Sequence, residues 1–312
     1  MSSRKIAVAM LALVVCSIGV VAQASPFSSG PWSQAVEIEL SAPGAHADFN
    51  TPTSLDGCPF ISPDGKSFFM ASDRVPGGLG GLDIWVSTRR HIDDPWGAPV
   101  NLGAPINSPF ADFCPTLGRD GHAFFFVSNR PGFCGTAPNG DIYTTRFRDN
   151  GTVEPVEHLG CTVNSAFDEH SPFPLAESGS GPVLYFSSAQ PANAGDTPGD
   201  HDLYVSEWQG GRYGAPSAVA GINTTNFHEG QPNVRRDGLE IFFYSNRPGS
   251  QGNDIHSSTR QSTRDPWSMP VNLGPLVNSG AAETRPSLSW DGSTLYFGST
   301  RAGSSDIYVT SR

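Results

Sequence analysis

Charged residues are scarce in this sequence of 312 residues, where Asp, Glu, Lys and Arg together make up 16 %. An average soluble domain has roughly a quarter, so long helices with exposed ion pairs are not expected. Motifs of several enzyme classes are also absent. The sequence has no G-x-S-x-G nucleophile elbow, no H-E-x-x-H helix and no C-x-x-C pair. These absences argue against nucleophilic serine catalysis and against a zinc site.

A long hydrophobic run occurs only at the N-terminus. Arg4 and Lys5 precede an apolar stretch at 6–22, and Ala22-Gln23-Ala24 supplies small residues for a signal peptidase. We predict that residues 1–24 are a signal peptide and that the protein is exported to the periplasm or the extracellular space. The apolar stretch is shorter than the ~20 residues of a spanning helix, so no membrane insertion is expected.

Basic residues are outnumbered, with 19 Lys and Arg against 30 Asp and Glu. Removal of Arg4 and Lys5 with the leader takes the formal net charge from −11 to −13. Such a surface repels phosphate backbones. We therefore expect no nucleic-acid partner, and we expect a monomer.

The sequence contains an internal repeat of about 56 residues. One proline marks the same position in each unit, at Pro59, Pro115, Pro172, Pro232 and Pro286. Four units follow it with an Asp-Gly turn, whereas the third has "ESGSG" at 177–181. Asp-Gly between apolar runs is a strong hairpin signal, because glycine supplies the positive φ of the turn. Each unit therefore begins with a predicted hairpin.

Two further strands are predicted in each unit. Aromatic-rich segments such as "SFFMAS" and "EIFFYS" follow the turn, and a third strand then begins at an aspartate, as in "DIWV" and "DIYV". A fourth strand is clearest around Trp96 and Trp267, in "PWGAPVNLG" and "PWSMPVNLG". Four antiparallel strands are the content of one propeller blade.

The ends of the sequence complete each other. The fifth unit stops after its third strand, and its missing fourth strand matches "PWSQAVEIEL" at 31–40, which aligns Trp32 with Trp96 and Trp267. We predict an all-β fold in which residues 25–312 form one five-bladed β-propeller domain. The N-terminal strand at 31–40 would join the last blade and close the ring.

These repeats resemble a known family. The segment "SPDGKSFFMASDR" at 62–74, followed by "LDIWVS" at 82–87, is similar to the TolB-type or WD40-like (PD40) propeller repeat of bacterial exported proteins. The resemblance covers essentially the whole chain after the leader. It implies the propeller fold but no single function, because that family includes assembly factors, binding modules and propellers fused to hydrolases.

Antiparallel order places the loop that leads into each first strand on the same face as the loop between strands two and three. We call this the lead-in face, and we expect any binding surface there. It receives one carboxylate from every unit, three residues before the marker proline: Asp56, Asp112, Glu169, Glu229 and Glu283. These carboxylates are candidates for a ring near the channel mouth.

The carboxylates have three interpretations. They could bind backbone N–H groups and arginines as scaffold, or they could hold calcium, which prefers oxygen ligands. They could also hydrolyse glycosidic bonds, which needs two carboxylates ~5–10 Å apart, and Asp56, Asp112 and Glu169 match the layout of five-bladed glycosidases. We favour the scaffold role, because the position is acidic in every unit.

The lead-in face also contains a repeated arginine and a position that varies between units. Arginines end the second strand in four units, and we expect each to pair with the aspartate that opens strand three, as Arg74 with Asp83. The residue before the marker proline varies from unit to unit: Cys58, Cys114, Ser171, Gln231 and Arg285. Among these, Gln231 and Arg285 are candidates for ligand selection at the channel mouth.

Four cysteines remain after the leader, and an exported protein can form disulfides. We favour Cys134–Cys161, because both lie in loops of the lead-in face on the same side of one blade. Cys58 and Cys114 occupy equivalent places in neighbouring blades, close to the ~7 Å limit for a bridge. The sequence does not choose among the three pairings.

The main functional hypothesis is a non-enzymatic binding or scaffolding module. A protein, peptide or glycan would bind the lead-in face at the channel mouth. The alternative is a glycan-active hydrolase that uses Asp56, Asp112 and Glu169. No cofactor is predicted, with calcium at the carboxylates as the alternative.

Overall fold

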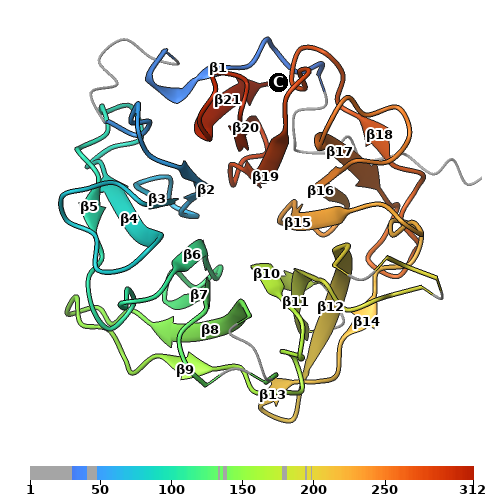
Figure 1. Ribbon diagram of the computed structural model, residues 1–312, viewed down its shortest axis with the longest axis horizontal. Helices are drawn as coiled ribbons and strands as arrows, with labels where there is room; N and C mark the ends of the chain where they lie inside the picture. The colour runs from blue at the N-terminus through green and yellow to red at the C-terminus, as the bar shows by residue number, and fades with distance from the viewer. Residues whose placement is uncertain are drawn as a thin grey trace, which may run out of the picture.

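The structure is a computed structural model that describes residues 30–40, 48–132, 134–135, 139–177, 181–193, 195–197 and 199–312. The predicted signal peptide at 1–24 lies outside these residues. Five antiparallel sheets surround one axis (Figure 1), which confirms the predicted five-bladed propeller. The described residues contain no α-helix, only the short 3₁₀ turn η1 (Ile38–Leu40).

The first strand of each blade is the innermost one and lines the axis (Figure 1). Blade 1 contains β2 (Asp56–Ile61), β3 (Ser67–Ser72), β4 (Asp83–Thr88) and β5 (Val100–Asn101). Blade 2 contains β6 (Asp112–Leu117), β7 (Ala123–Ser128), β8 (Asp141–Arg146) and β9 (Glu157–His158). Blade 4 contains β15 (Glu229–Val234), β16 (Glu240–Ser245), β17 (Asp254–Thr259) and β18 (Val271–Asn272).

Blade 5 closes the ring as predicted. It contains β19 (Glu283–Leu288), β20 (Thr294–Ser299), β21 (Asp306–Ser311) and the N-terminal β1 (Val36–Glu37). Strand β1 pairs with β21, so that Val36 lies opposite Val309. The Arg312 guanidinium lies over the Trp32 ring and pairs with Glu240 of blade 4 at 2.7 Å. The N-terminal strand β1 and the C-terminal Arg312 are thereby held to the same part of the ring.

Blade 3 departs from the common pattern. It contains β10 (Glu169–Glu177), β11 (Gly181–Ser188), β12 (Asp202–Gln209), β13 (Arg212–Tyr213) and β14 (Ser217–Ala218). Strand β12 is longer than its counterparts, and it first turns back into β13 through Gly210-Gly211 before β14 pairs with it. Both glycines have positive φ, 58° and 91°, as a tight two-residue hairpin requires. The blade therefore carries an extra hairpin at its outer edge.

The second strands build the core between the blades. Alternate residues point to opposite sides of a strand, and two positions of each second strand are almost completely buried. Phe68, Phe124, Leu184, Ile241 and Leu295 occupy one of them, and Met70, Phe126, Phe186, Phe243 and Phe297 the other. These side chains pack against the neighbouring blade, as where Phe69 contacts Phe124. The aromatic repeat in the sequence is therefore the packing between blades.

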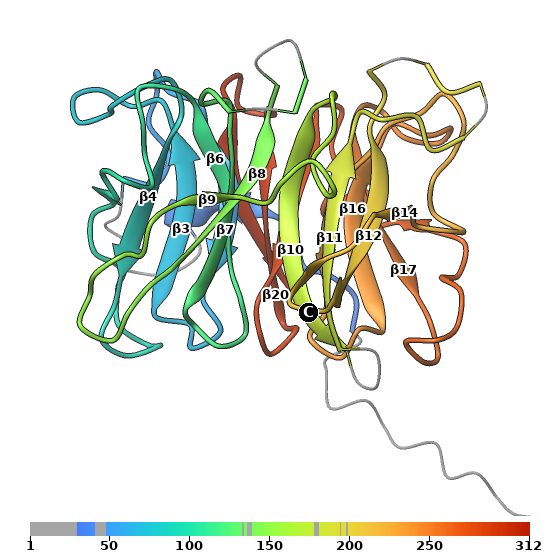
Figure 2. The same ribbon diagram turned by 90° about the horizontal axis from the view of Figure 1, so that it is seen from below.

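Seen from the side, the propeller is a disc with two faces at opposite edges (Figure 2). The loops between second and third strands lie at the upper edge, together with the lead-in loops. The Asp-Gly turns lie at the lower edge, which we call the turn face.

Candidate functional site

Each strand-one carboxylate is completely buried at the start of its blade, with 0 % of its surface exposed in all five cases. In blade 2, the backbone N–H and the hydroxyl of Ser108 both donate to Asp112 Oδ2 at 2.7 Å. Arg130 Nη2 donates to the other oxygen, Oδ1, at 2.6 Å. The side chain of Asn107 meanwhile bonds the backbone of Ile84 in the preceding blade. The Asn-Ser motif therefore connects two blades, because Asn107 bonds blade 1 and Ser108 bonds the carboxylate of blade 2.

The same arrangement recurs in the blades that carry an arginine. Nη2 of Arg74, Arg247 and Arg301 lies 2.6, 3.1 and 3.0 Å from the strand-one carboxylate of its own blade. The expected pairing of Arg74 with Asp83 is wrong, because Asp83 instead accepts hydrogen bonds from Leu79 N and Asn101 Nδ2. Two contacts hold the Arg74 side chain beside its own blade. Ser72 Oγ accepts a hydrogen bond from its Nε, and its guanidinium lies over the Trp85 ring.

These contacts correct the expectation that Asp56, Asp112, Glu169, Glu229 and Glu283 form a ring at the channel mouth. None of them is among the residues that line the cavity on the propeller axis. Their oxygens point into the contacts between blades. A buried carboxylate that meets donors on both oxygens contributes to the scaffold. Substrate has no access to Asp56 or Asp112 in this arrangement.

Glu169 differs from the other four carboxylates. Blade 3 has Gln190 at the arginine position, and among the described residues the Glu169 carboxylate accepts hydrogen bonds from Ser165 N, Ser165 Oγ and Ser188 Oγ alone. Burial raises the pKa of Glu169 to about 7, although these hydrogen bonds act in the opposite direction. Blade 3 therefore holds a carboxyl group that is half protonated near neutral pH.

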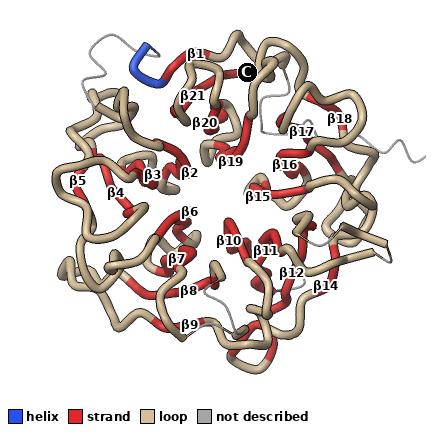
Figure 3. The backbone as a smooth tube through the Cα atoms, in the orientation of Figure 1, coloured by secondary structure: helices blue, strands red, loops and turns tan. Residues whose placement is uncertain are grey.

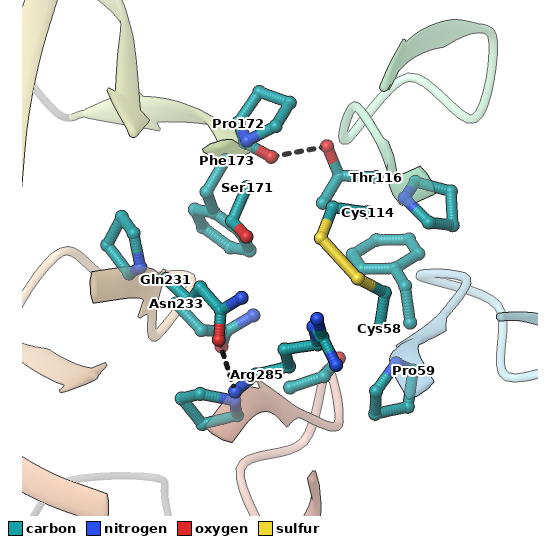
Figure 4. Close-up of a pocket in the computed structure, with 15 residues that line it drawn as sticks. Cys58, Pro59, Cys114, Thr116, Ser171, Pro172, Phe173, Gln231, Asn233 and Arg285 are labelled. Atoms are coloured by element: carbon teal, nitrogen blue, oxygen red, sulfur yellow. Dashed lines mark hydrogen bonds between the residues drawn. A yellow bond between two sulfur atoms is a disulfide. The ribbon is translucent and has the colours of Figure 1, made fainter. Parts of the chain in front are cut away.

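The residues before the marker prolines surround the axis (Figure 4). All five have positive φ, between 47° and 58°, although none is glycine: Cys58, Cys114, Ser171, Gln231 and Arg285. The register between first and second strands shifts at this place in every blade, as in a β-bulge. The bulge directs these side chains to the axis, where they enclose a cavity of about 30 Å³.

Two disulfides connect the first three blades. Cys58 is bonded to Cys114 across the axis-facing edges of blades 1 and 2, with Cα atoms 4.8 Å apart. Cys134, in the loop after β7, is bonded to Cys161 in the loop that leads into blade 3. The favoured bridge Cys134–Cys161 is confirmed, and Cys58–Cys114 is the bridge that the sequence left open. The disulfide Cys58–Cys114 forms one wall of the axial cavity (Figure 4).

A much larger cavity lies between blades 2 and 3, with a volume of about 870 Å³. The Asp-Gly turn of blade 2, the end of β10 and the extra hairpin β12–β13 line it. Trp208 is 43 % exposed there, with its ring edge-on to Tyr213 at 5.0 Å. We call this space the blade 2–3 cleft. It lies on the turn face, opposite the lead-in face on which the sequence analysis predicted a binding surface.

Charged groups accompany the aromatic rings of the cleft. Arg146 pairs with Asp120 at 2.9 Å across its wall. Glu154 pairs with Arg148 at 3.2 Å. Glu157, at the start of β9, is exposed, and its carboxylate has no ion pair or hydrogen bond within the described part of the chain. The cleft therefore combines aromatic rings, a guanidinium and an unpaired carboxylate.

Sequence reasoning did not identify the residues of the cleft. One signal was present in "EWQGGRY" at 207–213, because Gly-Gly between aromatic residues predicts a tight hairpin. That hairpin carries Trp208 and Tyr213. The space beside it arises only when two blades pack together, which the repeat does not specify.

No family model and no curated protein matches the chain. Among solved structures, a thermostable family-43 glycoside hydrolase is similar over 85 % of this chain and 91 % of its own, with 13 % identity and a TM-score of 0.56. The endo-arabinase from Bacteroides thetaiotaomicron is similar over 83 % and 94 %, with 14 % identity and a TM-score of 0.55. The putative TolB from Agrobacterium tumefaciens is similar over 88 % and 80 %, with 15 % identity and a TM-score of 0.51.

These comparisons overturn the main functional hypothesis. Glycoside hydrolases predominate among the similar structures, which favours the alternative of a glycan-active hydrolase over a non-enzymatic scaffold. One TolB structure is similar as well, but membership of the TolB-type repeat family stays a prediction. At this level of identity, the likeness establishes the shared five-bladed fold alone.

Proposed function

We propose that this propeller is a glycan-active protein of the glycoside hydrolase type and that it binds its saccharide in the blade 2–3 cleft. The observation that carries the proposal is the exposed Trp208 in a cavity of about 870 Å³ that also contains carboxylates. A cavity of this size lies within the ~300–1,000 Å³ range of ligand sites. The proposal is supported by the predominance of glycoside hydrolases among proteins of similar fold.

The cleft offers each kind of contact that a sugar needs. The faces of a pyranose or furanose carry C–H groups, which pack on an aromatic ring such as that of Trp208, while Arg146 can donate two parallel hydrogen bonds to hydroxyls or a carboxylate. Hydrolysis needs one carboxyl group as acid and another as base or nucleophile. Glu157, which has no partner in the described residues, is the candidate base, and Glu154 is the candidate second group.

The test is binding and turnover of arabinan, xylan and pectin oligosaccharides by the protein and by three variants. Trp208→Ala should weaken binding at least tenfold, because the platform is removed. Glu157→Gln should abolish turnover and leave binding within about twofold. Trp290→Ala, at the channel end of the turn face, is the matched control and should change neither. Binding that survives Trp208→Ala unchanged would contradict the proposal.

We also propose that the chain is exported after cleavage behind Ala24. The two disulfides support this, since such bonds persist in oxidising compartments. No helix among the described residues combines the length and the apolar character that a membrane crossing demands.

A further inference from the structure

Arg285 is exceptional among the half-buried arginines of this propeller. Arg74, Arg130, Arg247 and Arg301 each meet a buried carboxylate. The Arg285 guanidinium has no ion pair and no hydrogen bond within the described residues, and its Nε is buried without an acceptor. The residue is half-buried, but its Nε has lost contact with solvent without gaining an acceptor, which is costly for a charged group. A bound anion would supply the missing acceptor.

The position of the Arg285 side chain depends on a glycine in the next blade. A Cβ atom at Gly57 would lie 3.0 Å from Arg285 Nη1, so the guanidinium occupies space that any side chain would fill. Gly230 leaves room in the same way for the ring of Tyr244, which would lie 2.4 Å from its Cβ. The equivalent residues of the other blades have side chains: Phe113, His170 and Thr284. In two of the five blades, a glycine at this position therefore leaves space for the side chains of Arg285 and Tyr244.

Unused hydrogen-bonding groups line the same cavity. Ser171 Oγ and Ser287 Oγ are both buried and have no partner. Gln231 Oε1 accepts from the backbone N–H of Arg285 at 2.7 Å, which fixes this residue at the axis. In Figure 4 the Arg285 side chain extends from its own blade toward Cys58 of blade 1. The cavity thus offers a planar cation and two hydroxyl donors.

The charge of this site is positive. The pKa of His170 is lowered to about 3 by burial, by His201 and by Arg285, so its imidazole is neutral. Burial raises the pKa of Tyr244 to about 12, so its phenol is neutral as well. The strand-one carboxylates are turned away into the blade contacts. Arg285 is left as the one charged residue that lines the axial cavity in the described structure.

We propose that the axial cavity is an anion site in which Arg285, Ser171 and Ser287 bind a carboxylate group. The guanidinium plane matches a carboxylate through two parallel N–H bonds. A cavity of about 30 Å³ admits such a group but not a sugar ring. The carboxylate belongs either to a small free acid or to an acidic sugar whose ring stays outside the cavity. This site goes beyond the proposed function and does not depend on the blade 2–3 cleft.

The experiment is calorimetric titration of the folded protein with acetate, galacturonate and galactose. We expect acetate or galacturonate to bind and galactose, which lacks the carboxylate, to bind at least tenfold more weakly. Tighter binding of acetate identifies a free acid, and tighter binding of galacturonate identifies an acidic sugar. No binding of either acid would overturn the proposal.

Variants test whether Arg285 is responsible. Arg285→Gln should reduce acid binding at least tenfold, while Arg236→Gln, at the turn-face end of the channel, should not change it. Gly57→Ala keeps the charge but displaces the guanidinium, and it should weaken binding severalfold even if Arg285→Gln does not fold. Ser171→Ala should weaken binding to a smaller extent. Acid binding that persists in both Arg285→Gln and Gly57→Ala would contradict the site, whatever the effect of Trp208→Ala.

Discussion

Five equivalent buried carboxylates differ in whether a cation neutralises them. Glu283 meets Arg301 at 3.0 Å, whereas Glu169 meets a backbone N–H and two hydroxyls and no cation in the part of the chain that the structure describes. Removing one partner of a buried ion pair costs about 3–5 kcal/mol, because the other charge is left alone. The same chemical substitution should therefore have opposite consequences in blades 3 and 5.

We predict that Glu169→Gln stabilises the protein at alkaline pH, whereas Glu283→Gln destabilises it. The folded-state pKa of Glu169 is raised from 4.5 to about 7, so the wild-type protein loses stability as the pH rises through this window. Replacement by neutral glutamine removes that loss, a gain of up to about 3 kcal/mol at pH 8 that disappears near pH 4. Glu283→Gln should cost about 3–5 kcal/mol at pH 7 because Arg301 loses its counter-charge.

Urea unfolding of both variants at pH 4, 6 and 8 measures these differences. Equal destabilisation by the two substitutions at every pH would refute the assigned difference between the blades.

At the scale of elements, the two disulfides reinforce only one side of the ring. Cys58–Cys114 closes a sequence separation of 56 residues and Cys134–Cys161 one of 27, and both lie within blades 1 to 3. A cross-link restricts the unfolded chain more when the closed loop is longer. Blade 5 is instead completed by β1, and the contact of Arg312 with Glu240 connects it to blade 4.

We predict that replacing each cysteine pair by serine lowers the free energy of unfolding by about 3–4 kcal/mol. The pair Cys58→Ser with Cys114→Ser should have the larger effect, because its loop is longer. Non-reducing peptide mapping of the wild-type protein should recover both cross-linked peptides. Four free thiols in the oxidised protein, or unchanged stability in both double variants, would contradict the assigned bridges.

The strands were predictable from the sequence, and the partners of their charged side chains were not. The spacing of Pro59 and its counterparts, with the Asp-Gly turns, locates the first two strands of most blades because hairpin chemistry is local. The partner of Arg74 depends on a lead-in loop that folds back over the blade, which brings Asp56 rather than Asp83 to the guanidinium. The blade 2–3 cleft depends on the packing of two blades. Of its parts, the sequence signals only the hairpin at 207–213.

At the scale of the whole molecule, the two faces of the disc have different properties. On the lead-in face, the repeated carboxylates, arginines and Asn-Ser/Thr pairs bond to one another and connect neighbouring blades. On the turn face, the departure of blade 3 from the repeat opens a cleft with exposed Trp208. Function is therefore expected where the five-fold regularity breaks, since the regular positions are used by the scaffold.

Hydrogen–deuterium exchange locates the saccharide-binding surface directly. It is measured with and without the arabinan, xylan or pectin oligosaccharide that binds most tightly. Glu157→Gln protein prevents turnover during the experiment. We predict slower exchange at 118–123, 174–176 and 208–213, which line the blade 2–3 cleft. Exchange at 56–59 and 283–287 should not change. Protection confined to the lead-in face, with none at 208–213, would show that the saccharide is not bound between blades 2 and 3.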